Sequence, residues 1–158
     1  MAIAYLSLGT NDGNLKKHID EAISHISRHC KILKKSSLYR AQPKDEGAPH
    51  FINCVLKIHT DFNPYKLLEF VQSIEKQLRQ QKLLFLRSHK TIDIDILFYD
   101  DLILVDEKIV IPHPNLHKRN HILVPFAEIE PDFVHPLHNK KISSYELDDK
   151  MVLRIQAL

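Results

Sequence analysis

The stretch TIDIDILFYD, residues 91–100, has the alternating pattern of a β-strand. Apolar side chains, most of them β-branched or aromatic, recur there at every second position: Ile92, Ile94, Ile96 and Phe98. A strand sends alternate side chains to opposite faces, so Asp93 and Asp95 are expected together on the other face, about 7 Å apart. Two carboxylates this close on a half-buried strand repel each other. A divalent cation would offset that cost, and the alternative is an edge strand whose aspartates face solvent or pair with Lys and Arg.

The segments before this strand alternate between strand-like and helix-like periodicity. Two helices are expected: one has apolar residues at helical spacing from Leu15 to Ile26, and the other begins at Asn63 and Pro64 and runs to about Gln81. Strand-like segments cover residues 1–9, 32–42 and 51–60. The resulting order, strand-helix-strand-strand-helix-strand, is typical of the ferredoxin-like βαββαβ sandwich, an α+β fold.

Smaller elements are predicted after the sandwich. A hairpin covers residues 102–111, and a segment rich in His and Pro follows it. Ser143 and Glu146 have the spacing of a capping box, which predicts a short last helix. Because no linker, repeat or low-complexity tract interrupts the chain, residues 1–158 are expected to form a single domain.

The composition indicates an ordinary soluble protein. Hydrophobic residues make up 44% of the 158 residues and charged residues 27%, and no apolar run approaches the ~18 residues that cross a membrane. The N-terminus lacks a signal-peptide pattern, and Cys30 and Cys54 form no closely spaced motif, so we expect a cytoplasmic protein. The net charge of +2 is too small to indicate a nucleic-acid partner.

The two aspartates favour Mg²⁺, which takes one or two carboxylates and completes its shell with water and substrate phosphates. A triphosphate here could not rest on a glycine-rich loop, because neither GxxxxGK[ST] nor GxGxxG is present. It would be held by metal and by the cationic and imidazole side chains that flank the aspartates. These are Arg79, Lys82, Arg87, Lys90, Lys108, His113, His117, Lys118 and Arg119. The alternative for each is a solvated surface charge.

His113, His117 and His121 lie four residues apart, a spacing that could bind zinc on one face of a helix. Pro114 places His113 before a helix rather than within it, and the chain has neither an HExxH motif nor paired cysteines. A phosphate-binding or stacking role, or simple exposure to solvent, is therefore favoured over zinc.

Six motifs in a fixed order carry a family resemblance. They are LGTN at 8–11, SSLYRAQP at 36–43, FINCV at 51–55, LLEFVQSIEKQL at 67–78, TIDIDILFYDD at 91–101 and IPHPNLHKRNHILVPFAEIEPDFVHP at 111–136. Together they resemble the 6-hydroxymethyl-7,8-dihydropterin pyrophosphokinases of folate biosynthesis, from about residue 3 to residue 136. The resemblance implies a ferredoxin-like fold. It also implies transfer of the β,γ-pyrophosphoryl group of ATP to the hydroxymethyl group of a reduced pterin, with release of AMP.

The resemblance further implies roles for individual residues. Asp93 and Asp95 match the aspartates that hold two Mg²⁺ ions against the phosphates of ATP, and Asp95 is the nearest candidate for a general base. The ATP site would comprise Gln72, Glu75, Lys82, Lys90, Lys108, His113 and Arg119. The pterin site would comprise Gly9, Phe51, Asn53 and His121. In it Asn53 would hydrogen-bond the pterin between the rings of Phe51 and His121, although Phe51 could instead be an ordinary core residue.

The chain departs from the family where arginines are usual. Gln80 and Lys82 stand where two arginines are usual, and Lys90 stands at a third such position. Lys keeps the charge but loses the bidentate fork that matches phosphate. We expect Lys82, Lys90 and Asp95 to be the catalytic residues, with Arg79 or Arg87 as substitutes for the missing arginines. The alternative is a catalytically impaired module that binds pterin and nucleotide. A nuclease or RNA-binding domain is disfavoured, because no aromatic-rich RNA-binding strand motif is present.

The expected partners are small molecules, ATP and 6-hydroxymethyl-7,8-dihydropterin. Neither nucleic acid nor a membrane is expected to bind. We expect a monomer and leave open an association with other enzymes of folate synthesis.

Overall fold

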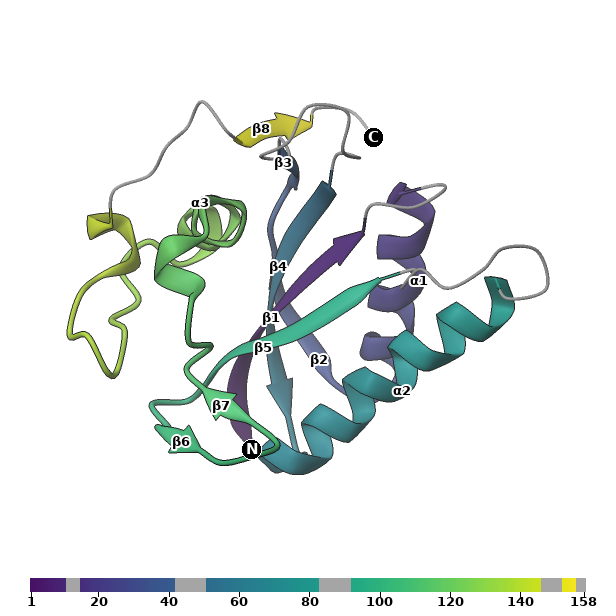
Figure 1. Ribbon diagram of the computed structural model, residues 1–158, viewed down its shortest axis with the longest axis horizontal. Coiled ribbons are helices and arrows are strands. Elements are labelled where there is room, and N and C mark those ends of the chain that lie inside the picture. Colours follow the sequence, from purple (N-terminus) through teal and green to yellow (C-terminus); the bar gives the residue numbers. More distant parts are fainter. Residues whose placement is uncertain (11–14, 42–50, 83–91, 146–151, 156–158) are drawn as a thin grey trace.

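An antiparallel sheet forms the centre of the structure, a computed structural model that describes residues 1–10, 15–41, 51–82, 92–145 and 152–155. Its strands are β1 (Ala2–Thr10), β2 (Lys31–Lys35), β3 (Leu38–Ala41), β4 (Phe51–Thr60), β5 (Asp93–Tyr99) and β8 (Val152–Ile155). Their order in space is β5-β1-β4-β3-β8, and β2 also pairs with β4 (Figure 1). Every one of these pairs is antiparallel. The predicted βαββαβ order is confirmed, with its second strand divided into β2 and β3.

Helices α1 (Leu15–Ser27) and α2 (Pro64–Lys82) cover one face of this sheet (Figure 1). Both follow the predicted periodicity, and their inward side chains are buried: Ile19, Ala22 and Ile26 on α1, and Leu67, Val71, Ile74 and Leu78 on α2. Each fully buried aliphatic side chain stabilises the fold by roughly 1.5–3 kcal/mol. The predicted start of α2 is also confirmed, because Oδ1 of Asn63 accepts a hydrogen bond from the N–H of Lys66 at 2.9 Å.

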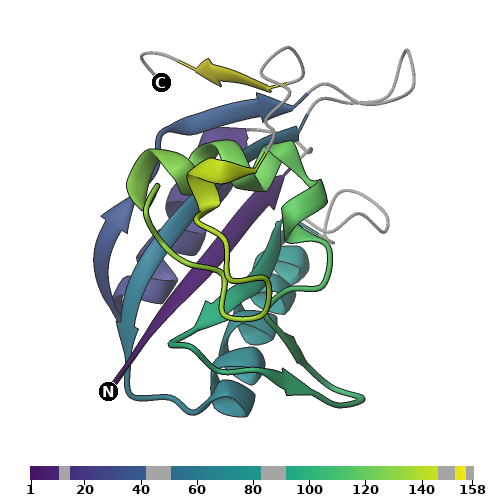
Figure 2. The same ribbon diagram turned by 90° about the vertical axis from the view of Figure 1, so that its left-hand side faces the viewer.

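Helix α3 (Asn120–Ile129) lies over the opposite face of the sheet, the α3 face (Figure 2). A second apolar cluster fills the space beneath it, made of Tyr5, Val55, Leu97, Phe98, Leu116, Ile122, Leu123, Phe126 and Ile142. The rings of Tyr5 and Phe126 lie 4.8 Å apart between centroids, and those of Phe98 and Phe126 lie 5.4 Å apart. This aromatic packing holds α3 against β1 and β5.

A β-bulge in β5 corrects the predicted alternation. Tyr5 pairs with Phe98 but the next residue, Leu6, pairs with Ile96, so Leu97 is an extra residue in β5. Ile92, Ile94 and Ile96 pack toward α1 and α2, as predicted, whereas Leu97 and Phe98 both pack beneath α3. The expectation that Phe98 shares a face with the three isoleucines was therefore wrong.

The extended segment predicted over residues 32–42 is interrupted at Ser36. The N–H of Ser36 donates to the carbonyl of Val55 at 2.9 Å, and the Ser36 hydroxyl accepts from the N–H of Val55 at 2.8 Å. This side-chain hydrogen bond replaces a regular step of the ladder, and the chain continues as β3 beside the first residues of β4.

The elements after β5 agree only in part with the prediction. The hairpin is present as β6 (Leu104–Val105) and β7 (Val110–Ile111). Ser143 lies inside a short 3-10 helix, η2 (Ile142–Ser144), and Lys141 precedes it, so Ser143 does not cap a last helix. Glu146 lies outside the described residues, and strand β8 was not predicted. Among the described helices, none combines the length and hydropathy that a membrane span requires.

Candidate functional site

Strand register brings three of the predicted residues into one row. Gly9 of β1 pairs with Asn53 of β4 on one side and with Asp93 of β5 on the other. Residues paired across antiparallel strands share a face of the sheet. In the next row Ser7 pairs with Val55 and with Asp95, and Val55 belongs to the cluster beneath α3. Both rows therefore lie on the α3 face.

Gly9 and Asn53 fit each other closely. A Cβ on Gly9 would lie 2.6 Å from Oδ1 of Asn53, so only glycine leaves room for this amide. Asn53 is 5% exposed, and its Nδ2 is buried without a hydrogen-bond partner among the described residues. An unpaired buried donor costs about 1–3 kcal/mol. A ligand that accepts this hydrogen bond would recover that cost.

Asp93 and Asp95 stand at the opposite end of the two rows from Asn53 and Val55. Asp93 is exposed and Asp95 is partly exposed. Within the described residues no group of three or more His, Cys, Asp or Glu could hold a metal ion, which counts against zinc at the histidines. Two carboxylates open to solvent do fit Mg²⁺, because this ion leaves most of its shell to water and phosphate.

His113 joins the site through the backbone of β5. Its N–H donates to the carbonyl of Leu97, the bulged residue, at 3.0 Å. Burial lowers the pKa of His113, the carboxylate of Asp95 opposes that shift, and the charge of Arg119 adds to it. The His113 imidazole thus interacts electrostatically with both the carboxylate of Asp95 and the guanidinium of Arg119.

His121 and Arg119 lie at the start of α3. The carbonyl of Arg119 accepts from the N–H groups of Ile122 and Leu123, at 3.0 Å each, which closes the first turn of the helix. Burial, together with the charges of Arg119 and His113, lowers the pKa of His121 to about 4. His121 is therefore a neutral ring at pH 7. Through these interactions Asp95, His113, Arg119 and His121 form one electrostatically linked group.

Gln72 and Glu75, two of the predicted ATP residues, lie in the middle of α2. Oε2 of Glu75 accepts a hydrogen bond at 3.3 Å from the N–H of Ile94, the residue between the two aspartates. Gln72 is exposed one turn earlier. Arg79, one turn after Glu75 on the same side of the helix, has a buried Nε with no hydrogen-bond partner among the described residues. This orphan donor supports Arg79 as a replacement for a missing arginine.

The remaining predicted residues are placed differently. Phe51, the first residue of β4, is 40% exposed, so it is not an ordinary core residue. Lys108 lies in the turn between β6 and β7, where its N–H donates to Asp106, and no described contact joins its exposed side chain to the aspartates. The side chains of Lys82, Arg87 and Lys90 lie outside the described part of the structure.

Ser7 was missed in the sequence. It is a buried polar residue beside Asp95, two residues before Gly9 on the same face. The only available signal was a hydroxyl in an otherwise apolar strand, which gains meaning only once the register of β1 and β5 is known.

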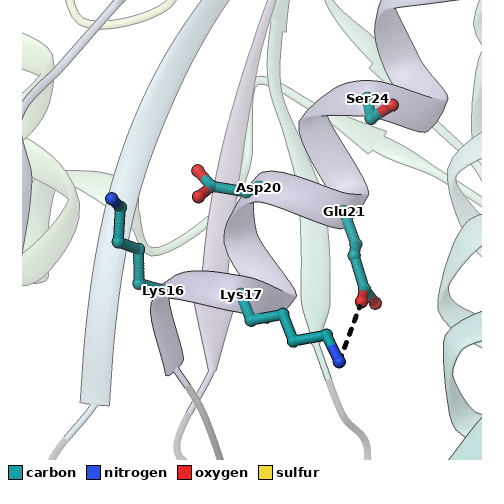
Figure 3. Close-up of a pocket in the computed structure, with 5 residues that line it drawn as sticks. All are labelled: Lys16, Lys17, Asp20, Glu21 and Ser24. Atoms are coloured by element: carbon teal, nitrogen blue, oxygen red, sulfur yellow. Dashed lines mark ion pairs between the residues drawn. The ribbon is translucent and has the colours of Figure 1, made fainter. Parts of the chain in front are cut away.

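A hollow on the outer side of α1 is separate from this site. It is lined by Lys16, Lys17, Asp20, Glu21 and Ser24 (Figure 3). Two of these residues, Lys17 and Glu21, form an ion pair at 3.8 Å (Figure 3). None of the predicted site residues lines this hollow.

Comparison with known proteins decides the family. Residues 5–131 match the model of the 7,8-dihydro-6-hydroxymethylpterin-pyrophosphokinase family. The chain belongs to this family. It is 33% identical over 152 residues to the 2-amino-4-hydroxy-6-hydroxymethyldihydropteridine pyrophosphokinase of Aquifex aeolicus, which covers 96% of this chain and 94% of that protein.

Some relatives of this chain are much longer proteins. The folic acid synthesis protein fol1 of Pneumocystis carinii is 41% identical over 145 residues, and the match covers 89% of this chain but 19% of fol1. The crystal structure of Plasmodium falciparum HPPK-DHPS with pterin and p-hydroxybenzoate superposes with a TM-score of 0.77. That match covers 99% of this chain and 47% of the other at 18% identity, so it supports the ferredoxin-like fold alone.

Proposed function

We propose that this chain transfers the pyrophosphoryl group of ATP to the hydroxymethyl group of 6-hydroxymethyl-7,8-dihydropterin, releasing AMP, as a step of folate biosynthesis. The observation that carries the proposal is the row across β4, β1 and β5. It sets Nδ2 of Asn53, which is buried and has no hydrogen-bond partner among the described residues, on the same sheet face as Asp93. A ring rich in hydrogen-bonding groups would bind at one end and the phosphates at the other.

The pterin side of the site consists of Gly9, Phe51, Asn53 and His121. Nδ2 of Asn53 would donate to an acceptor on the pterin, and Gly9 keeps the space beside that amide open. Phe51 is exposed at the end of β4, where a planar ligand can stack on it. The neutral ring of His121 would stack on the other side.

The phosphate side consists of Asp93, Asp95, His113 and Arg119. Asp93 and Asp95 would hold two Mg²⁺ ions, which neutralise charge on the phosphates when bound. Arg119 and His113 would donate hydrogen bonds to phosphate oxygens. Asp95 is the residue that we propose as acceptor for the proton of the attacking hydroxyl. Gln72 would line the nucleotide site, and Lys82, Lys90, Lys108 and Arg79 are the further cations proposed there.

Four broader proposals accompany this function. We propose that residues 1–158 fold as one pyrophosphokinase domain and act as a monomer in the cytoplasm, where ATP is abundant. Association with other folate enzymes is supported by relatives in which a region similar to this chain is part of a longer folate protein. Size-exclusion chromatography with light scattering of the pure protein tests the monomer.

The function is tested by incubating the protein with ATP, Mg²⁺ and the pterin and separating the nucleotide products. Pterin-dependent AMP is expected, with a pterin diphosphate formed in equal amount. ADP would indicate an ordinary kinase. Binding of both ligands without any turnover would instead support the catalytically impaired module.

A further inference from the structure

Glu75 contacts the backbone of the strand that carries both metal-binding aspartates. Oε2 of Glu75 lies 3.3 Å from the N of Ile94. Ile94 is 4% exposed, and its side chain belongs to the core between the sheet and the helices α1 and α2. The neighbouring residues Asp93 and Asp95 face the other way, toward the α3 face.

This contact occurs at the edge of the sheet. Among the described strands β5 pairs only with β1, so every second N–H of β5 points away from its partner. A buried N–H without an acceptor is costly. The carboxylate of Glu75, which reaches down from α2, supplies the acceptor at the peptide between the two aspartates.

A direct role for Glu75 on the nucleotide fits this geometry poorly. Its carboxylate is already an acceptor for Ile94, and a negative charge repels a polyphosphate. Glu75 also approaches β5 from the side of α2, whereas Asp93 and Asp95 project from the opposite face of the strand. The family resemblance had placed Glu75 among the ATP-binding residues.

We propose that Glu75 is a positioning residue: it fixes the peptide between Asp93 and Asp95 and so sets where the two carboxylates project. The proposal rests on the proposed function for its consequence in catalysis. The contact with Ile94 itself does not depend on that function. Loss of the acceptor would loosen β5 at this peptide and weaken the binding of Mg²⁺, while metal-free nucleotide would still bind.

The test compares Glu75→Ala, Glu75→Gln and a control, Glu69→Ala. Gln keeps an acceptor oxygen and removes the charge, whereas Ala removes both. Glu69 is an exposed acid of the same helix that pairs only with Lys66 among the described residues, at 3.2 Å. Amide hydrogen exchange of Ile94, followed by NMR in the free protein, is expected to speed up on the order of tenfold in Glu75→Ala. It is expected to stay near the wild-type rate in the other two variants.

Binding supplies the second measurement. We expect the Mg²⁺ concentration for half-maximal activity to rise several-fold in Glu75→Ala alone, with unchanged affinity for ATP in the presence of a chelator. Unchanged Ile94 exchange in Glu75→Ala, or weaker metal-free ATP binding in both Glu75 variants, would overturn the proposal. If Glu75→Ala does not fold, the shorter Glu75→Asp replaces it. Since exchange needs no turnover, an inactive wild type would refute only the proposed function.

Discussion

Gly9 lies so close to the side-chain amide of Asn53 that residue 9 has no room for a Cβ. The missing Cβ of Gly9 would lie 2.6 Å from Oδ1 of Asn53. On its other side Gly9 pairs with Asp93 of β5, so Gly9 lies between Asn53 and that aspartate in the sheet. A glycine in a strand usually weakens it. Here it leaves room for a buried amide at one end of the row.

Gly9→Ala is expected to displace the Asn53 amide. The new methyl group would force a shift in a packed row, which costs roughly 1–3 kcal/mol of folding free energy, and pterin affinity should fall about tenfold or more. Chemical denaturation and calorimetric titration with the pterin measure the two effects. The double variant Gly9→Ala/Asn53→Ala should recover stability relative to Gly9→Ala. Equal stability of the single and double variants would contradict the steric link.

Asn53→Ala removes a donor, Nδ2, that has no hydrogen-bond partner among the described residues. We expect the free energy of unfolding to change little, because the lost packing is offset by loss of an unsatisfied buried group. Pterin affinity should fall about tenfold or more, whereas ATP affinity should not change. Titration calorimetry with each ligand separates these effects. If Asn53→Ala binds the pterin as tightly as the wild type does, Asn53 does not hydrogen-bond the ligand.

His135 predicts a dependence of stability on pH. It is 2% exposed, its ring stacks on His138 at 4.0 Å between centroids, and its Nδ1 accepts from the N–H groups of Leu137 and His138. Burial, together with the charges of His138 and His117, lowers the pKa of His135 to about 4. The unfolded chain therefore binds more protons between about pH 4 and pH 6.5, so stability rises with pH across that window.

The stability contributed by His135 is present above pH 6.5 and is lost as the pH falls toward 4, by about 3 kcal/mol in all. The free energy of unfolding, measured with urea at several pH values, should depend less steeply on pH in His135→Asn than in the wild type. Asn keeps a hydrogen-bond acceptor but does not titrate. His29→Asn, at an exposed histidine of the α1–β2 connection, is the control. An unchanged slope in His135→Asn would refute this origin of the pH dependence.

Much of the site could be predicted because its residues follow simple periodicities. Alternation places Asp93 and Asp95 together on one face of β5, and the strand register then puts them on the same face as Gly9 and Asn53. The bulge at Leu97 could not be predicted, since one extra residue in an apolar strand leaves composition and pattern almost unchanged. It is this bulge that turns Phe98 toward α3.

Hydrogen bonds between side chains and the backbone also could not be predicted from the sequence. The bond from Ile94 to Glu75 depends on the distance between an edge strand and a helix, and Ile94 looks like any core isoleucine. The division of β2 and β3 depends on a hydroxyl at Ser36 that bonds the chain of β4. Because serine is common in extended segments, its presence at position 36 does not predict this hydrogen bond.

The most direct test of the account compares Asp95→Asn with the wild type and with Asp101→Asn, an exposed acid just after β5. Pterin-dependent AMP release and pterin affinity are measured on all three. Asp95→Asn is expected to lose at least about a hundredfold in turnover while it binds pterin normally, and Asp101→Asn should match the wild type. Turnover retained in Asp95→Asn would contradict the claim that the phosphates of ATP are held at this end of the row.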